Sequence, residues 1–170
     1  MKKLLLAGLL VIFSLLGSKQ ASAQVHHGRP ELFSRCNGIV LETPDSVAQA
    51  YRRLYQSLQA AGYTMSSPAI HNGEYAFVAT RLKAGATNTR VHLEFLAKQE
   101  RKQTYLSGRG YYAKGETKPV FPPITNNGDP GSAEAEAWAE LQNAIALYQV
   151  PGTTTWYRRD EITSFKSRYK

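Results

Sequence analysis

The stretch from Asn88 to Lys98 alternates between apolar and polar side chains, and this pattern constrains the fold more than any other in the chain. Its apolar positions are Val91, Leu93, Phe95 and Ala97, and its polar positions include Arg90, His92 and Glu94. A period of two is typical of a strand that is buried on one face and near water on the other. Other elements of the chain therefore have to cover one side of a sheet.

Two further runs, Glu74–Leu82 and Gln103–Ala113, are bounded by turn residues and have the composition of strands. Gly108 and Gly110 lie inside the second run and predict a bulge or a sharp bend there. The links between the three runs are short. This favours antiparallel pairing of consecutive strands, because parallel strands need a long crossover connection.

Two helices are predicted from apolar residues that recur at spacings of three and four. The first covers residues 44–61, with Thr43-Pro44-Asp45 as its start signal and Gly62 as its stop. The second covers residues 132–149 and begins at the capping residue Ser132. The apolar stripes are Val47, Tyr51, Leu54 and Leu58 in the first helix, and Trp138, Leu141, Ile145 and Tyr148 in the second.

These elements predict an α+β fold in which two helices pack on one face of a three- to four-stranded antiparallel sheet, in the order α-β-β-β-α. Short extra strands are expected at 39–41 and 153–157. A single domain would span 36–157, between a flexible arm at 24–35 and a basic tail at 158–170. The expected core residues are Leu54, Leu58, Leu93, Phe95, Trp138, Leu141 and Ile145.

Residues 1–23 have the three parts of a secretory signal. Lys2 and Lys3 precede an apolar run over residues 4–16, and Ala21-Ser22-Ala23 then supplies small residues for cleavage. The apolar run is shorter than the roughly 18 residues that span a bilayer. We therefore expect cleavage, no transmembrane segment afterwards, and a mature protein that is periplasmic or secreted.

The charge balance predicts the class of partner. Loss of three signal lysines lowers the formal net charge from +8 to +5. Much of the remaining excess is in the tail, where basic and aromatic residues are interleaved. They are Arg158, Arg159, Phe165, Lys166, Arg168, Tyr169 and Lys170, and Trp156 and Tyr157 lie just before them. This composition suits an anionic envelope polymer, a membrane surface or another envelope protein, and export argues against nucleic acid. A solvated basic surface without a specific partner is the alternative.

Cys36 is the only cysteine, so no disulfide can form within the chain. It lies well downstream of the cleavage site, whereas a lipid-modified cysteine would follow that site directly. We expect a partly buried thiol, and a disulfide between two chains is the alternative. The fold must then be stable without covalent cross-links.

No sequence motif of a known catalytic class is present. Gly108-Arg109-Gly110 lacks the third glycine of a phosphate loop, and zinc-ligand spacings and a nucleophile elbow are missing. No cofactor is expected. His92 and Glu94 are the candidate acid–base pair of a small secreted hydrolase or isomerase, since they share one strand face. The simpler interpretation is a polar pair near water, whose replacement by alanine leaves stability nearly unchanged.

Two further candidate sites, a ligand-binding surface and a metal site, are predicted from residue type. Tyr75, Tyr105 and Tyr111 with Arg109 are candidate ligand-binding residues, because aromatic and basic groups on a sheet suit sugar rings or an extended anionic polymer. Packing of tyrosines within strands is the alternative.

A mature terminus of Gln24-Val25-His26 would offer an amine, two amide nitrogens and an imidazole, which suit copper(II) or nickel(II) in a square plane. His27 would add a second imidazole, although cyclisation of the terminal glutamine would remove the amine. A periplasmic copper- or nickel-binding protein is therefore one functional class. We favour a non-catalytic binding or accessory module of the bacterial envelope or extracellular space over this class and over an enzyme.

We predict that the exported protein begins at Gln24, because Ala21 and Ala23 fit the small-residue requirement of signal peptidase. Terminal sequencing or the intact mass of secreted protein measures this. Material that keeps the apolar run of residues 4–16 and stays at the membrane would contradict the prediction.

Overall fold

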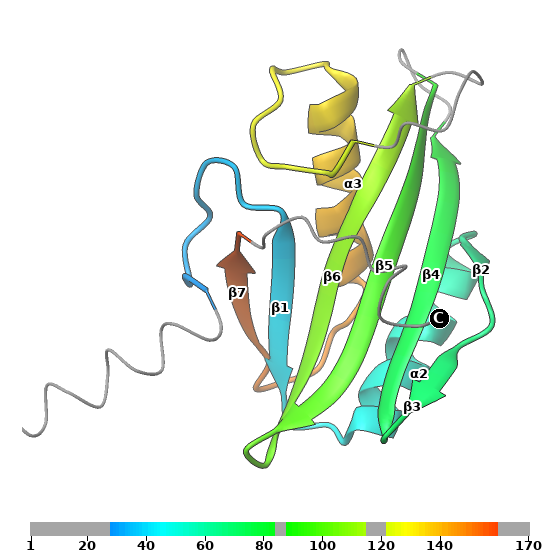
Figure 1. Cartoon of the computed structure of the whole chain (residues 1–170), viewed down its shortest axis with the longest axis vertical. Helices are drawn as coiled ribbons and strands as arrows, with labels where there is room; N and C mark the ends of the chain where they lie inside the picture. Colours follow the sequence, from blue (N-terminus) through cyan, green and yellow to red (C-terminus); the bar gives the residue numbers. More distant parts are fainter. Residues whose placement is uncertain (1–27, 84–87, 115–121, 160–170) are drawn as a thin grey trace, which may run out of the picture.

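The computed structural model describes residues 28–83, 88–114 and 122–159. Within them, seven strands form one antiparallel sheet, and two helices lie together on one of its faces (Figure 1). The elements in chain order are β1 (Gly38–Thr43), α2 (Val47–Ala60), β2 (Thr64–Met65), β3 (Ala69–His71), β4 (Glu74–Lys83), β5 (Thr89–Glu100), β6 (Gln103–Lys114), α3 (Ala133–Ala146) and β7 (Thr154–Arg158). The predicted α+β class is confirmed.

The sheet has the strand order β2-β4-β5-β6-β1-β7, and β3 also pairs with β4. The first strand in the sequence, β1, therefore lies between β6 and the last strand, β7. At the outer edge of β7, the backbone of Arg29 pairs with Tyr157, with N–H to O distances of 2.8 and 2.7 Å in the two directions. This part of the segment expected as an arm thus pairs with the sheet.

The predicted strand number and the order α-β-β-β-α do not match the fold in detail. Strands β2 and β3 have two and three residues and were not expected, because segments so short carry no readable alternation. The short strands expected at 39–41 and 153–157 are present as β1 and β7. Both pair along their whole length, and β1 comes before the first helix.

The first helix begins later than predicted. Its N-cap is Ser46, which forms a reciprocal capping box with Gln49. Thr43 is the last residue of β1, and its hydroxyl is 2.8 Å from the hydroxyl of Tyr148. Thr43 is therefore part of the sheet, and its hydroxyl is hydrogen-bonded to Tyr148, which follows α3. The second helix begins at the predicted cap, Ser132, which accepts a hydrogen bond from Ala135.

The core lies between the helices and the sheet. All seven residues expected in the core are buried and belong to one hydrophobic cluster. Aromatic rings extend this cluster along α2 and β4, where Phe77 stacks on Phe95 with ring centroids 5.2 Å apart. Leu54 and Leu58 from α2 and Leu141 from α3 have no exposed surface. Burial of this apolar surface against the sheet is what stabilises both helices.

The glycines of β6 do not form the predicted bulge, because β5 and β6 pair without interruption from Thr89–Lys114 to Glu100–Gln103. They instead allow close packing on the helix side of the sheet. A Cβ atom at Gly108 would lie 2.9 Å from the ring of Phe95 and 3.0 Å from Cδ1 of Ile145. The missing side chain lets α3 rest directly on β6.

We predict that Gly108→Ala destabilises the protein by about 1–3 kcal/mol, because the added methyl group overpacks the contact between α3 and β6. Urea denaturation measures the free energy of unfolding. Ile145→Val removes the Cδ1 atom, so the two substitutions together should be less destabilising than the sum of the single effects. Strict additivity would contradict the contact as the cause.

Candidate functional site

Glu94 lies on the sheet face opposite the helices and is engaged in an ion pair. Its Oε2 atom is 3.0 Å from Nε of Arg109, the residue directly across on β6. The two side chains are only 20% and 16% exposed. The carboxylate proposed as a general base is therefore held by a guanidinium group in a partly desolvated position.

His92 lies on the same face, between Thr80 of β4 and Tyr111 of β6. It is half-buried, and burial lowers the pKa of its imidazole, with a further contribution from the positive charge of Arg90. A lowered pKa favours the neutral imidazole near pH 7. The structure thus places His92 and Glu94 side by side, but it pairs Glu94 with Arg109.

The sheet face opposite the helices, which was expected to lie near water, is partly buried. Val40, Tyr105 and Ser107 all project to it and are 3%, 6% and 8% exposed. Charged groups can occupy such a partly buried face when they are paired, as Glu94 and Arg109 are. Substitutions here therefore act on packed groups and not on freely solvated ones.

The four residues predicted as an aromatic and basic platform do not lie together. Tyr105, Arg109 and Tyr111 are alternate residues of β6 and share the face opposite the helices. Tyr75 belongs to the helix side, where its ring stacks on Tyr51 of α2 at 4.8 Å between centroids and 19° between planes. A single surface that uses all four side chains is therefore not available.

The histidines of the proposed metal motif, His26 and His27, lie outside the described residues, as does the tail beyond Arg159. Within the described ranges, no group of three or more histidine, cysteine, aspartate or glutamate residues is placed to hold a metal ion. No helix in this part of the chain is both long enough and apolar enough to cross a membrane.

Cys36 is fully buried, where a partly buried thiol was expected. It lies in the loop before β1, and its carbonyl accepts a hydrogen bond from the backbone of Asn126 at 2.9 Å. Burial raises the pKa of the thiol. A disulfide between two chains would therefore require this loop to open first.

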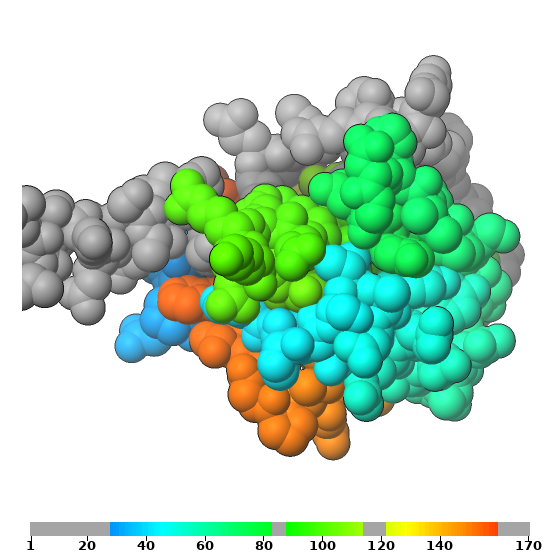
Figure 2. Space-filling view, turned by 90° about the horizontal axis from the view of Figure 1, so that it is seen from below, coloured from blue at the N-terminus to red at the C-terminus, as the bar shows by residue number. Residues whose placement is uncertain are grey.

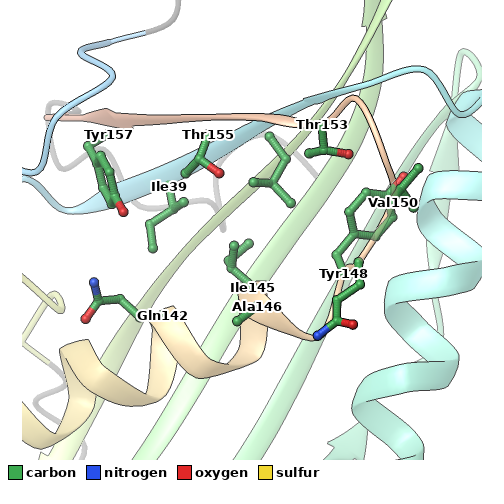
Figure 3. Close-up of a pocket in the computed structure, with 11 residues that line it drawn as sticks. Ile39, Gln142, Ile145, Ala146, Tyr148, Val150, Thr153, Thr155 and Tyr157 are labelled. Carbon is green, nitrogen blue, oxygen red and sulfur yellow. The ribbon is translucent and has the colours of Figure 1, made fainter.

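A groove with a volume of about 320 Å³ lies on the helix side of the sheet, between the strands β1 and β7 and the C-terminal half of α3 (Figure 3). Its apolar lining consists of Ile39, Leu41, Ile145, Ala146 and Val150. Its polar lining consists of Gln142, Tyr148, Gln149, Thr153, Thr155 and Tyr157. None of these eleven residues carries a charge.

The helices pack most extensively on the central strands of the sheet. α3 packs on β5 and β6, and α2 packs on β4, β5 and β6. The helix-side residues of β1 and β7 alternate with those of the opposite face, so Ile39 and Leu41 lie beside Tyr157 and Thr155. These side chains form the floor of the groove, where Ile39 and Leu41 are buried and Thr155 and Tyr157 are half-buried.

One end of the groove is fixed by hydrogen bonds. The hydroxyl of Tyr148 is 2.8 Å from that of Thr43 and donates to Asp45 at 3.0 Å. Burial raises the pKa of Tyr148 to about 12. Figure 2 shows this end of the molecule, where the segment after α3 (orange) lies beside the start of α2 (cyan). Tyr148 therefore has a structural role, and the other polar residues remain for a ligand.

Sequence reasoning did not identify this groove. It assigned Ile145 to the core, Tyr148 to the apolar stripe of the second helix and residues 153–157 to a strand, and Ile145 and Tyr148 are both buried in the core cluster. The one available signal was the alternation of Thr153, Thr155 and Tyr157 on one face of that strand. Alternation alone does not say which strand lies beside β7.

Comparison with protein-family models gives no match, and no curated protein is significantly similar to the chain.

We predict that Glu94→Ala lowers the free energy of unfolding by about 1.5–3 kcal/mol, because it removes a charged partner of the largely buried Arg109. Urea denaturation measures the effect. Glu100→Ala is the matched control, since its ion pair with Lys98 on the same strand is more exposed. The control should change stability by less than about 1 kcal/mol. Equal effects of the two substitutions would contradict the role of burial.

Proposed function

We propose that this protein is a non-catalytic binding module, exported to the bacterial envelope or extracellular space, whose ligand occupies the groove between β1, β7 and α3. The observation that carries the proposal is the groove itself, a hollow of about 320 Å³ beside β1 and β7 whose eleven described lining residues are uncharged. Ile39 and Leu41 form its buried floor, and its more accessible lining includes Ala146, Gln149, Val150 and Thr155.

The size and lining of the groove support binding of a small molecule. Its volume of about 320 Å³ falls at the lower end of the usual range for ligand sites, which is about 300–1,000 Å³. Ligand sites commonly combine an apolar surface with a few polar groups that orient the ligand. Here Gln142, Thr155 and Tyr157 are such groups.

The proposed enzyme alternative has less support. To act as a general base, Glu94 would have to give up its ion pair with Arg109 before it accepts a proton from a substrate. His92 is a half-buried imidazole whose pKa is lowered by burial, which favours its neutral form near pH 7. We therefore place function in the groove. The basic tail is proposed to hold the module near an anionic polymer, a membrane surface or another envelope protein.

We predict that the wild-type protein binds the neutral fluorescent probe phenylnaphthylamine, with a rise in probe emission. Thr155→Phe should reduce the affinity at least about tenfold, because the larger ring fills the groove. Thr154→Phe is the matched control. It makes the same change on the neighbouring residue of β7, whose side chain projects to the opposite face beside Glu42.

Fluorescence titration at constant protein concentration gives the dissociation constants, and urea denaturation verifies that both variants fold. Equal loss of binding in the Thr155 and Thr154 variants would place the probe elsewhere. Absence of probe binding to the wild-type protein would reject the groove as an apolar ligand site.

A further inference from the structure

The sheet face opposite the helices is buried at a position where an open face would be accessible. Val40 projects to this face and is 3% exposed. Trp156 flanks it on β7, but its other neighbours on the face include Gly38 along β1 and Ser107 on β6, which are too small to shield a valine from the side. Both helices lie on the other face, behind the sheet in Figure 1. The burial of Val40 thus requires a group above it.

Tyr105 gives the same indication from the neighbouring strand. It projects to the same face and is 6% exposed, although Ser107, two residues along β6, is much smaller. Burial raises the pKa of the Tyr105 hydroxyl, and the charges of Glu42 and Glu100 contribute to the same shift. The covered area therefore includes residues of both β1 and β6.

The chain beyond Arg159 begins next to this area. β7 ends at Arg158, which pairs with Gly38, two residues before Val40 on β1. Eleven residues, 160–170, follow Arg159. At about 3.3 Å per residue they can span roughly 36 Å, whereas the distance from β7 to β4 is roughly 19 Å at about 4.8 Å per strand. The segment 160–170 is thus long enough to cross the whole face.

Residues 115–121 are too few to reach the same area. This segment leaves β6 at Lys114 and returns to Pro122, whose carbonyl accepts a hydrogen bond from Tyr112. Ser107, which lies beside Val40, is roughly 23 Å along the strand from Lys114. A seven-residue segment that must return to its starting region extends by only about half its length, or roughly 12 Å.

The sequence of residues 160–170 suits a segment with one apolar side. In an extended chain, alternate side chains point in opposite directions, so Phe165 and Tyr169 share one side. Lys166 and Arg168 share the other side. Aromatic rings gain free energy when they cover the apolar surface of a sheet, and basic groups keep their hydration when they point away from it.

We propose that residues 160–170 lie across the sheet face opposite the helices, with Phe165 and Tyr169 against β1 and β6 and the basic side chains toward solvent. This inference goes beyond the proposed function of the groove, which lies on the other side of the sheet, and does not rest on it. It gives the basic tail a fixed place, so that its cationic groups are held at the surface of the sheet.

Alkylation of a thiol at position 40 tests whether the face is covered. Val40→Cys is introduced into the whole exported chain, and peptide mass spectrometry follows its reaction with iodoacetamide separately from that of Cys36. Cys36 is fully buried in the loop before β1 and is the internal reference for folding. We expect the thiol at position 40 to react at least about tenfold more slowly than one introduced by Ser67→Cys, because Ser67 is exposed.

The identity of the covering segment is tested by changing one side of the tail at a time. Phe165→Ser together with Tyr169→Ser removes the apolar side and should raise the rate at position 40 at least about tenfold, while Cys36 stays slow. Lys166→Ser together with Arg168→Ser is the matched control, because it makes two substitutions on the other side of the same segment. The control should leave the rate within about twofold.

Rapid reaction at position 40 in the chain with an unchanged tail would overturn the proposal. An unchanged rate in the aromatic variant, or an equal rise in both variants, would also show that Phe165 and Tyr169 are not the cover. Protection that depends on protein concentration would assign the face to a second copy of the chain instead. If faster reaction of Cys36 shows that Val40→Cys loosens the fold, Ser107→Cys on the same face repeats the measurement.

Discussion

The contact between α3 and β6 at Gly108 determines where the second helix lies, and the rest of the helix side follows from it. Any side chain larger than hydrogen at this position would meet Phe95 and Ile145 at about 3 Å. Because glycine has no side chain, Ile145 of α3 packs directly against β6. With α3 packed on β5 and β6, residues of its C-terminal half line the groove beside β1 and β7. Close packing at β6 thus helps to position one wall of the groove.

Two polar clusters hold α3 at either end of this contact. Near its C-terminus, Tyr148 joins Thr43 and Asp45, and Asp45 also pairs with Arg53 of α2 at 2.8 Å. Toward the middle of α3, the buried Glu140 accepts a hydrogen bond from Tyr63 at 2.6 Å and pairs with Arg81 at 3.2 Å.

These clusters give the groove a preformed shape. Glu140 ties α3 to Tyr63 and to Arg81 of β4, and Tyr148 ties the segment after α3 to Thr43 of β1, so the helix has little freedom to close over the groove. A preformed site loses less conformational entropy on binding than one that must order itself around the ligand. The groove is therefore a better candidate for binding than the opposite face, where charged and polar groups already pair with each other.

The elements of this fold could largely be predicted from the sequence, because each leaves a local signal. The alternation around Leu93 and Phe95 and the cap at Ser132 are examples, and both are confirmed. The start of α2 was missed because Thr43, a good cap by residue type, is used instead by β1 and by Tyr148. A local signal such as a cap residue does not show whether a tertiary contact already uses the same side chain.

The candidate site depends on information that is not local. Tyr75 and Tyr105 look equivalent in the sequence, yet the register of β4, β5 and β6 places them on opposite faces. The groove depends on the insertion of β1 between β6 and β7, two partners that are distant in the chain. Neither the register nor this strand order follows from residue type or spacing.

The edge of the sheet at β7 explains how an accessible groove can exist beside an exposed strand. An open edge strand invites pairing with another chain, and proteins usually block such edges. Here the backbone N–H and carbonyl groups of Tyr157 are both hydrogen-bonded to the backbone of Arg29. Gly28 makes this approach possible, since a Cβ atom there would lie 2.1 Å from the carbonyl oxygen of Tyr157. This bridge is isolated, and no neighbouring residue of the described segment extends it into a ladder. The pairing is thus limited to one residue, which covers the strand edge at Tyr157 and leaves the groove beside Thr155 uncovered.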